Sequence, residues 1–434
     1  KMAITMGIDT IMRADRIILM AWGEEKATVI KDIVEGEENS ATPATCLQKH
    51  PNIEVVVDEG ASQELTRVKT PWLVGTCLWP ERFIRTAVLW LCRKVDKPIL
   101  KLTYQDYIDN RLGQLLEATG QTYDMINIQV FNDLQHTISG WPGGKPNADD
   151  STRPERATPY PKRVLIFSPH PDDDVISMGG TFIRLIAQGH DVHVAYQTSG
   201  NIAVLDDIVL QTLDTARECG FVDRYNEVQE IINNKKKGEA EPIELRRLKG
   251  SIRRAEAKAA CRQMGLTDPS HVHFLNLPFY ETGGVKKGLL TDKDIQIVVD
   301  LLREIKPHQI YAAGDLSDPH GTHRVCIEAV LAAMEVVQDE EWVKECRLWL
   351  YRGAWQEWDL DMVDMAVPLS PDEVIQKRHA IYRHLSQKDI VPFPGEDKRE
   401  FWQRAEERNQ NTARLYDKLG MAEYQAIEVF VRLF

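Results

Sequence analysis

The sequence lacks the patterns that mark disulfide-rich, membrane-spanning and nucleic-acid-binding proteins. Its seven cysteines are an odd number, are scattered and include no Cys-x-x-Cys pair, so neither a disulfide framework nor a cysteine zinc site is expected. No apolar run is long enough to cross a bilayer, and no signal peptide is visible. The net charge is −13 and the one basic run is Lys235-Lys236-Lys237, which argues against nucleic acid or an anionic membrane as a partner. These absences favour a cytoplasmic protein with reduced thiols.

The length of the chain and the position of its turn-forming residues predict more than one domain. A chain of 434 residues with 43% hydrophobic and 27% charged residues is globular in composition and too long for one typical domain. Glycine and proline are concentrated in residues 140–162, which we interpret as a linker. We expect an α/β module over residues 1–105, a helical connector and linker over 106–162, and a second domain over 163–434. The chain begins with Lys1 in a pattern already under way, so we expect a fragment.

Strand and helix signals alternate along the second domain. Buried strands are predicted at residues 164–167, 192–197, 273–277, 309–313, 348–351 and 427–433, with helices that include 177–188, 206–234, 244–264 and 292–305. In the first part of the chain we expect strands at residues 16–20 and 53–57 and one helix over 104–119. The alternation predicts a doubly wound, mostly parallel, Rossmann-like α/β sheet, with a partial α/β module in front.

The stretch Ser168-Pro169-His170-Pro171-Asp172-Asp173-Asp174 directly follows the first buried strand of the second domain. An imidazole and three carboxylates therefore stand where a strand ends, which is where open α/β sheets build their sites. A single aspartate would be explained as a cap on the following helix. Three aspartates beside a histidine favour an acid/base or metal site instead.

The same arrangement occurs again after the strand at 309–313, in the sequence Gly-Asp-Leu-Ser-Asp-Pro-His-Gly-Thr-His. His320 and His323 are three positions apart at a helix start, a spacing that can point both rings into one cavity. Two strand ends with histidine and aspartate predict a shared divalent-cation site. These ligand types suit catalytic zinc, and would also suit Fe²⁺ or Mn²⁺. Such a site supports metal-assisted amide hydrolysis, with a carboxylate as general base and a histidine that stabilises the oxyanion or protonates the leaving amine.

The two motifs resemble the signatures of the LmbE/PIG-L family of zinc-dependent de-N-acetylases, which act mainly on N-acetylglucosaminyl groups. Ser-Pro-His-Pro-Asp-Asp-Asp is similar to that family's Pro-His-Pro-Asp-Asp-Glu motif, and Pro-His-Gly-Thr-His is similar to its later His-Pro-Asp-His motif. The resemblance implies that His170, Asp173 and His323 bind the metal. It also implies that Asp172 is the general base and that His320 stabilises the tetrahedral intermediate.

Two positions depart from the pattern of that family. Asp174 replaces the usual glutamate with a shorter carboxylate, and its role is left unassigned. Thr322 stands where the family often has an aspartate that tunes the neighbouring histidine, and Asp318 is a candidate for that role. Without such a partner, the pKa of His320 is expected to differ from the family norm.

The first 70 residues resemble a different family. MAITMGIDTIMRADRIILMAWGEEKA, followed by ATCLQKHPNIEVVVDE, is similar to the C-terminal part of glucosamine-6-phosphate deaminase-isomerases. The resemblance implies that Lys26 contacts the sugar phosphate. The catalytic aspartates, histidine and glutamate of that family precede this segment, so we expect no deaminase activity from this chain.

We therefore predict a metal-dependent enzyme of amino-sugar metabolism that hydrolyses the N-acetyl amide of an amino sugar or its conjugate. Ser199, Asn201 and Arg352, which follow predicted strands, are candidate substrate-binding residues together with Lys26. The expected partner is a small-molecule amino sugar, with no nucleic acid and no membrane, and homo-oligomer formation is left open. Two alternatives are a deaminase-isomerase-like function of the full-length protein and a non-catalytic sugar-binding or regulatory protein.

Overall fold

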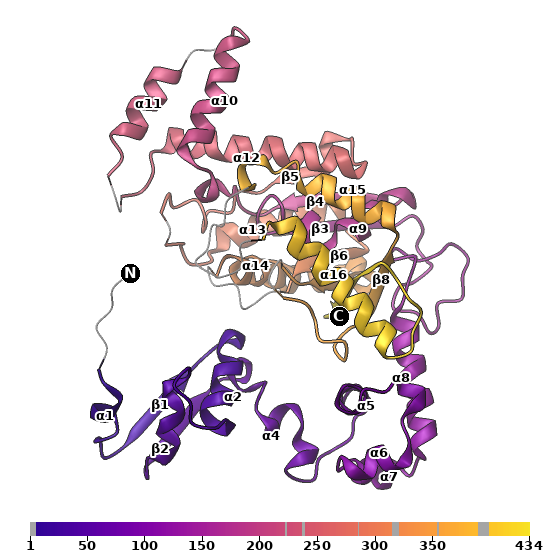
Figure 1. The fold of residues 1–434 in the computed structure, drawn as a ribbon. Helices are drawn as coiled ribbons and strands as arrows, with labels where there is room; N and C mark the ends of the chain where they lie inside the picture. The colour runs from indigo at the N-terminus through magenta and orange to yellow at the C-terminus, as the bar shows by residue number, and fades with distance from the viewer. Residues whose placement is uncertain are drawn as a thin grey trace. The chain divides into compact units, whose positions relative to one another are not determined.

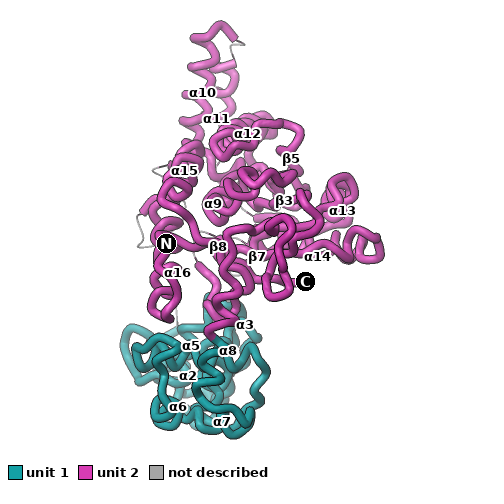
Figure 2. The backbone as a smooth tube through the Cα atoms, turned by 90° about the vertical axis from the view of Figure 1, so that its right-hand side faces the viewer, with its two compact units in different colours: residues 1–130 teal, residues 131–434 magenta. Residues whose placement is uncertain are grey.

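The chain folds into two compact units, residues 1–130 and 131–434 (Figure 2). A computed structural model describes residues 6–221, 224–236, 239–284, 286–314, 321–353, 356–388 and 399–434. Across these ranges, no helix combines the length and the apolar character that a bilayer span requires.

Unit 1 contains a small parallel sheet and a set of short helices. The two predicted strands are present as β1 (Ile17–Ala21) and β2 (Ile53–Val57), which pair in parallel (Figure 1). The segment predicted as one helix over 104–119 forms two, because Arg111 takes a left-handed conformation with φ of 62° between them. The helices are α1 (Ile8–Ile11), α2 (Ala27–Glu35), α3 (Glu59–Ser62), α4 (Thr66–Lys69), α5 (Glu81–Val95), α6 (Tyr104–Asp109) and α7 (Gly113–Thr119), and α8 (Tyr123–Thr137) runs on into unit 2.

Unit 2 is built on a seven-stranded sheet with the order β5-β4-β3-β6-β7-β9-β8. The first five of these strands are parallel, and β9 runs antiparallel to both of its neighbours. The prediction of a mostly parallel α/β sheet is therefore confirmed. The strands are β3 (Arg163–Ser168), β4 (Asp191–Tyr196), β5 (Val272–Phe274), β6 (Gln309–Ala313), β7 (Arg347–Tyr351), β8 (Met365–Leu369) and β9 (Ala426–Arg432).

Helices cover both faces of this sheet (Figure 1). Val164 and Ile166 of β3 pack in a buried core with residues of α9 (Asp173–Ala187), α12 (Ile243–Met264), α15 (Pro371–Ile381) and α16 (Phe401–Lys418). Leu165 and Phe167 belong to a second core with α13 (Asp292–Ile305) and α14 (Thr322–Val337). Because side chains alternate along a strand, a continuous apolar run such as β3 serves both layers.

Two parts of unit 2 differ from the sequence prediction. Residues 206–234 form two helices rather than one, α10 (Asp206–Glu218) and α11 (Tyr225–Asn233), which project from the rest of the unit as a hairpin (Figures 1 and 2). Gly220, with φ of 77°, ends the first of them. The sequence pattern does not predict β8, which is short and contains Pro368. A proline is tolerated there because β8 is an edge strand.

The glycine- and proline-rich segment at residues 140–162 packs against other parts of unit 2. The side-chain amide of Gln309 donates to the Pro142 carbonyl (3.0 Å), and that of Gln188 donates to the Gly140 carbonyl (2.8 Å). Arg347 donates to the Pro154 carbonyl (3.0 Å). The boundary between the compact units lies instead within α8, so this segment is part of the second unit.

His190, at the turn into β4, is expected to make the stability of unit 2 depend on pH. It is buried, its Nδ1 accepts a hydrogen bond from the backbone N–H of Lys162 (3.0 Å), and burial lowers its pKa to about 4. Since the unfolded chain binds this proton below pH about 6.5 and the folded chain does not, stability is lost as the pH falls from about 6.5 towards 4, by at most about 1.4 kcal/mol per pH unit. We expect His190→Gln to reduce the difference in unfolding free energy between pH 7 and pH 5, measured by urea denaturation. His379→Gln, at an exposed position on α15, is the control, and equal pH dependence in both variants would contradict the assignment.

Candidate active site

The carboxyl end of β3 bends sharply into α9 and so presents His170 and the three aspartates at the edge of the sheet. Ser168, the last residue of the strand, holds this bend: its hydroxyl donates to the His170 carbonyl (2.5 Å) and accepts from the backbone N–H of Asp174 (3.1 Å). The helix begins at Asp173. The site is thus attached to a strand that is buried from Val164 to Ser168, which gives its side chains a rigid base.

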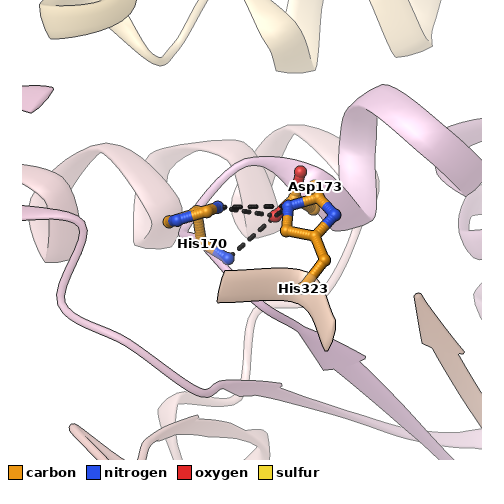
Figure 3. Close-up of side chains that lie close together, drawn as sticks. All are labelled: His170, Asp173 and His323. Atoms are coloured by element: carbon orange, nitrogen blue, oxygen red, sulfur yellow. Dashed lines mark hydrogen bonds and ion pairs between the residues drawn. The ribbon is translucent and has the colours of Figure 1, made fainter. Parts of the chain in front are cut away.

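His170, Asp173 and His323 form a compact cluster (Figure 3). The distance between His170 Nδ1 and Asp173 Oδ2 is 3.2 Å, that between His323 Nε2 and Asp173 Oδ2 is 3.2 Å, and that between the two histidine nitrogens is 3.3 Å. His323 reaches the cluster from the first turn of α14, which follows β6, and β6 pairs directly with β3. The two strand ends that carry the sequence motifs are therefore adjacent.

The spacing and chemistry of this cluster fit a divalent cation. Tetrahedral zinc, with ligands at about 2.0–2.1 Å, places neighbouring ligand atoms about 3.3 Å apart. Burial by itself would raise the pKa of Asp173, but His323 and His170 hold the pKa well below its usual range, so the carboxylate is ionised. Two imidazoles and one carboxylate leave further coordination positions for water and substrate.

Asp174, whose role the sequence leaves unassigned, is not part of this cluster. Its side chain is completely buried and accepts hydrogen bonds from Tyr196 Oη (3.0 Å) and Ser168 Oγ (3.3 Å). Burial raises its pKa to about 7. The contacts join the start of α9 to the ends of β3 and β4, so Asp174 maintains the bend that presents the cluster.

Asp172 is paired with an arginine that belongs to neither sequence motif. Arg253 on α12 is 1% exposed, and its Nη2 lies 3.0 Å from Asp172 Oδ1. Burial would lower the pKa of Arg253, but Asp172 and Glu256 raise it, so the guanidinium keeps its charge. Its Nε and Nη1 find no hydrogen-bond partner among the described residues, which leaves two buried donors beside the proposed base.

His384 is a second buried group that the sequence did not indicate. It lines a pocket with Asp172, Gln387 and Trp402, and it is 4% exposed. Burial lowers its pKa to about 4, so the ring is neutral at pH 7. Neither ring nitrogen has a hydrogen-bond partner within the part of the chain that the structure describes. A neutral imidazole here can donate or accept a hydrogen bond towards a molecule in the pocket.

The candidate substrate-binding residues are placed at several points of the fold. Ser199 and Asn201 follow β4 and are buried, and Asn201 Nδ2 donates to Ser199 Oγ (2.6 Å) and to Glu281 Oε2 (3.0 Å). Arg352 follows β7, and its guanidinium lies 4.1 Å from the ring centroid of Trp358. Lys26 is exposed in unit 1, at the start of α2. His320 and Asp318 lie outside the described residues.

The comparison with known protein families agrees with the two sequence motifs. Residues 165–334 match the family model for GlcNAc-PI de-N-acetylase, PIG-L. The chain therefore contains a PIG-L family domain, as its two histidine–aspartate motifs predict.

The chain as a whole is similar to a longer protein. It is 53% identical over 441 residues to a glucosamine-6-phosphate deaminase-like protein of Bacteroides thetaiotaomicron, an alignment that covers 99% of this chain and 66% of that relative. An N-terminal segment is 51% identical over 65 residues to the glucosamine-6-phosphate deaminase of Lactobacillus helveticus, covering 15% of this chain and 27% of that enzyme. The chain thus spans about two thirds of the first relative and about a quarter of the second.

Among solved structures, the N,N'-diacetylchitobiose deacetylase from Pyrococcus horikoshii is similar with a TM-score of 0.40 and 20% sequence identity. The alignment covers 63% of this chain and 84% of that protein.

Proposed function

We propose that unit 2 hydrolyses the N-acetyl amide of an amino sugar or its conjugate and that it requires a divalent cation for this reaction. The observation that supports the proposal most strongly is the cluster of His170, Asp173 and His323, whose three ligand atoms lie 3.2–3.3 Å apart. The PIG-L match over residues 165–334 supports the same reaction.

We assign the metal ligands to His170, Asp173 and His323. A cation bound to them supplies Lewis-acid polarisation of the acetyl carbonyl and makes water a stronger acid. We propose zinc, because histidine and carboxylate ligands without cysteine suit a catalytic zinc site, with Fe²⁺ and Mn²⁺ as the other candidates.

We propose that side chains of the protein carry out the proton transfers of the reaction. Asp172 accepts a proton from the attacking water as the new C–O bond forms, and it returns that proton to the amide nitrogen as the C–N bond breaks, so that acetate and the amine are released. Arg253 holds Asp172 in place through the 3.0 Å contact. His320 is proposed to stabilise the tetrahedral oxyanion.

The proposed substrate is an amino sugar of the N-acetylglucosamine type. Two comparisons support this class: the family description refers to GlcNAc, and the relatives of the N-terminal segment are named for glucosamine 6-phosphate. We propose that Asn201 and Ser199 with Glu281, and Arg352, contribute to binding the sugar, and that Lys26 binds a sugar phosphate in the full-length protein. All seven cysteines are free, which supports a cytoplasmic location, and no nucleic-acid or membrane partner is proposed.

The function is tested by acetate release from a panel of N-acetylated amino sugars. N-acetylglucosamine, its 6-phosphate, N-acetylgalactosamine and N,N'-diacetylchitobiose are incubated with the zinc-loaded protein, and acetate is measured by a coupled assay. We expect release from at least one N-acetylglucosamine compound. Absence of acetate from every compound would overturn the proposal and favour a sugar-binding protein without turnover.

Arg253 is expected to act through Asp172. Replacing it with methionine removes the contact that orients the base, so we expect kcat to fall by about 10–100-fold with little change in KM. Arg253→Lys keeps the charge and should recover part of the loss. An effect confined to KM would contradict this role and place the arginine on the substrate alone.

A second function is supported by the name of the relative from Bacteroides thetaiotaomicron, a glucosamine-6-phosphate deaminase-like protein. We propose deaminase-isomerase-like activity for the full-length protein as the alternative. Assay of glucosamine 6-phosphate deamination with the full-length gene product tests it, and Lys26→Ala should then raise KM for the phosphorylated sugar. Deamination with an unchanged KM in this variant would show that Lys26 does not bind the sugar phosphate.

A further inference from the structure

A second cluster of histidine and aspartate lies at the amino ends of β4 and β5, away from the candidate active site at the carboxyl ends. Asp191 and His193 are two positions apart on β4, so both side chains point to the same face of the sheet. The parallel register pairs Val194 with Val272 and Ala195 with His273, which brings His271 beside His193. Because β4 has six residues and a strand rises about 3.3 Å per residue, its two ends are about 16 Å apart, and the two clusters lie towards opposite ends of the parallel strands.

The possible ligand atoms of this second cluster lie close together. Asp191 Oδ1 lies 3.4 Å from His193 Nε2 and 3.6 Å from His271 Nε2, and all three atoms lie within 4.8 Å of one another. The rings of His193 and His271 are stacked, with centroids 4.2 Å apart. The side chain of His193 is 14% exposed, that of His271 27% and that of Asp191 42%, so the cluster is half-buried and open to solvent on one side.

A fourth residue orients the central histidine. His193 Nδ1 lies 3.1 Å from His273 Nε2, at hydrogen-bond distance. If Nδ1 is the donor, the lone pair of His193 is on Nε2, which faces Asp191 and His271. Metal-binding histidines commonly use their other ring nitrogen in this way.

We propose that Asp191, His193 and His271 form a second binding site for a borderline transition-metal ion such as Zn²⁺. Two imidazoles and one carboxylate, with no cysteine, are ligands for Zn²⁺, Ni²⁺ or Cu²⁺ rather than for Mg²⁺ or Ca²⁺. The separations of 3.4 and 3.6 Å come close to the roughly 3.3 Å between ligands of a tetrahedral zinc. Asp268, 3.9 Å from His271, adds negative charge near the ion.

The ion bound here joins β4 to a weak edge strand. β5 has only three residues and lies at the edge of the sheet. The same two strands lead, at their other ends, to Asn201 and Glu281, which hydrogen-bond to each other (3.0 Å). Metal binding at the amino ends therefore stabilises the strand pairing on which this contact depends, without providing a ligand to the candidate active site.

The test counts zinc per chain in tag-free protein, because a purification tag would bind zinc itself. After zinc loading and gel filtration, we expect two equivalents in the wild type. We expect one in His271→Gln and one in the double variant His170→Asn, Asp173→Asn. The combination of all three substitutions should retain none. His379→Gln, an exposed histidine on α15, is the matched control and should retain two.

Two further readouts keep the result independent of the catalytic proposal. Added zinc should raise the thermal midpoint of the His170→Asn, Asp173→Asn variant by several degrees, since a ligand that binds the folded state stabilises it, and His271→Gln in that background should abolish the shift. Asp191→Asn, at a more exposed ligand, replaces His271→Gln if circular dichroism shows that the latter is unfolded. Two equivalents in His271→Gln, or no zinc in the variant that lacks the first cluster, would overturn the second site.

Discussion

Replacing Asp172 with asparagine is expected to lower kcat for acetate release by about 10²–10⁴-fold, the usual loss when a general base is removed. The amide keeps the size of the side chain but cannot take the proton of the attacking water. Asp172 is not among the clustered ligand atoms, which belong to His170, Asp173 and His323, so zinc content should stay unchanged. The measurement is steady-state kinetics together with metal analysis of the same sample.

The matched control for this variant is Asp214→Asn, the same chemical change on α10. Asp214 forms a partly exposed ion pair with Arg217 (2.7 Å) and lies outside the cluster. Its kcat should equal that of the wild type. Full activity in Asp172→Asn would show that Asp172 is not the general base. Loss of zinc from that variant would show that Asp172 helps to bind the metal instead.

The second large effect is expected from Glu428→Gln, which breaks a buried ion pair in unit 2. Lys377 Nζ lies 2.7 Å from Glu428 Oε1, and the two side chains are 2% and 1% exposed. Glu428 also accepts hydrogen bonds from the backbone N–H groups of Gly180 (3.0 Å) and Thr181 (2.7 Å) in α9. Burial would raise the pKa of Glu428, but Lys377 holds it below its usual range, so the carboxylate is charged. Neutralising it leaves a buried ammonium without its partner, and we expect a loss of about 3–5 kcal/mol in unfolding free energy.

Urea denaturation of single and double variants tests this pair. Lys377→Met should cost a similar amount, because it leaves the carboxylate unpaired. The double variant should lose much less than the sum of the two, since neither charge then remains buried alone. Asp214→Asn, which breaks a partly exposed pair, should cost less than about 1 kcal/mol. Additive losses in the double variant would contradict the coupling.

The sequence is sufficient to predict the strand ends that form the candidate site. A continuous apolar run predicts β3 because the strand is buried on both faces, and the polar residues that follow it mark its carboxyl end. The repeat of that pattern after β6 predicts that His323 lies near His170. The structure places β3 and β6 side by side, and the ring nitrogens are 3.3 Å apart.

Other features depend on contacts between distant segments and could not be predicted. Arg253 falls among the buried positions of α12, with Lys249 and Ala257 one turn away on either side. That spacing is a signal, but only the fold shows that the arginine meets Asp172. His384 belongs to no sequence motif. Only the fold shows that its ring is buried and that neither ring nitrogen has a hydrogen-bond partner among the described residues. The second cluster needs the register between β4 and β5, which pairs residues about 80 positions apart.

Asp174 shows the same limit in a residue that the sequence did single out. Its place in a run of three aspartates suggests a role like that of its neighbours. The bend after β3 turns it instead into the protein, where it binds Tyr196 from the adjacent strand. Neighbours in sequence at a strand end can therefore have different partners, one in the site and one in the structure that supports it.

The most direct test of the central claim is acetate release by the same preparation before chelation, after chelation and after zinc is restored. If His170, Asp173 and His323 hold the cation that hydrolysis requires, release stops in the chelated protein and returns with zinc. It should not return in His323→Asn, which lacks one ligand. Acetate release that continues unchanged after the metal has been removed would contradict the account.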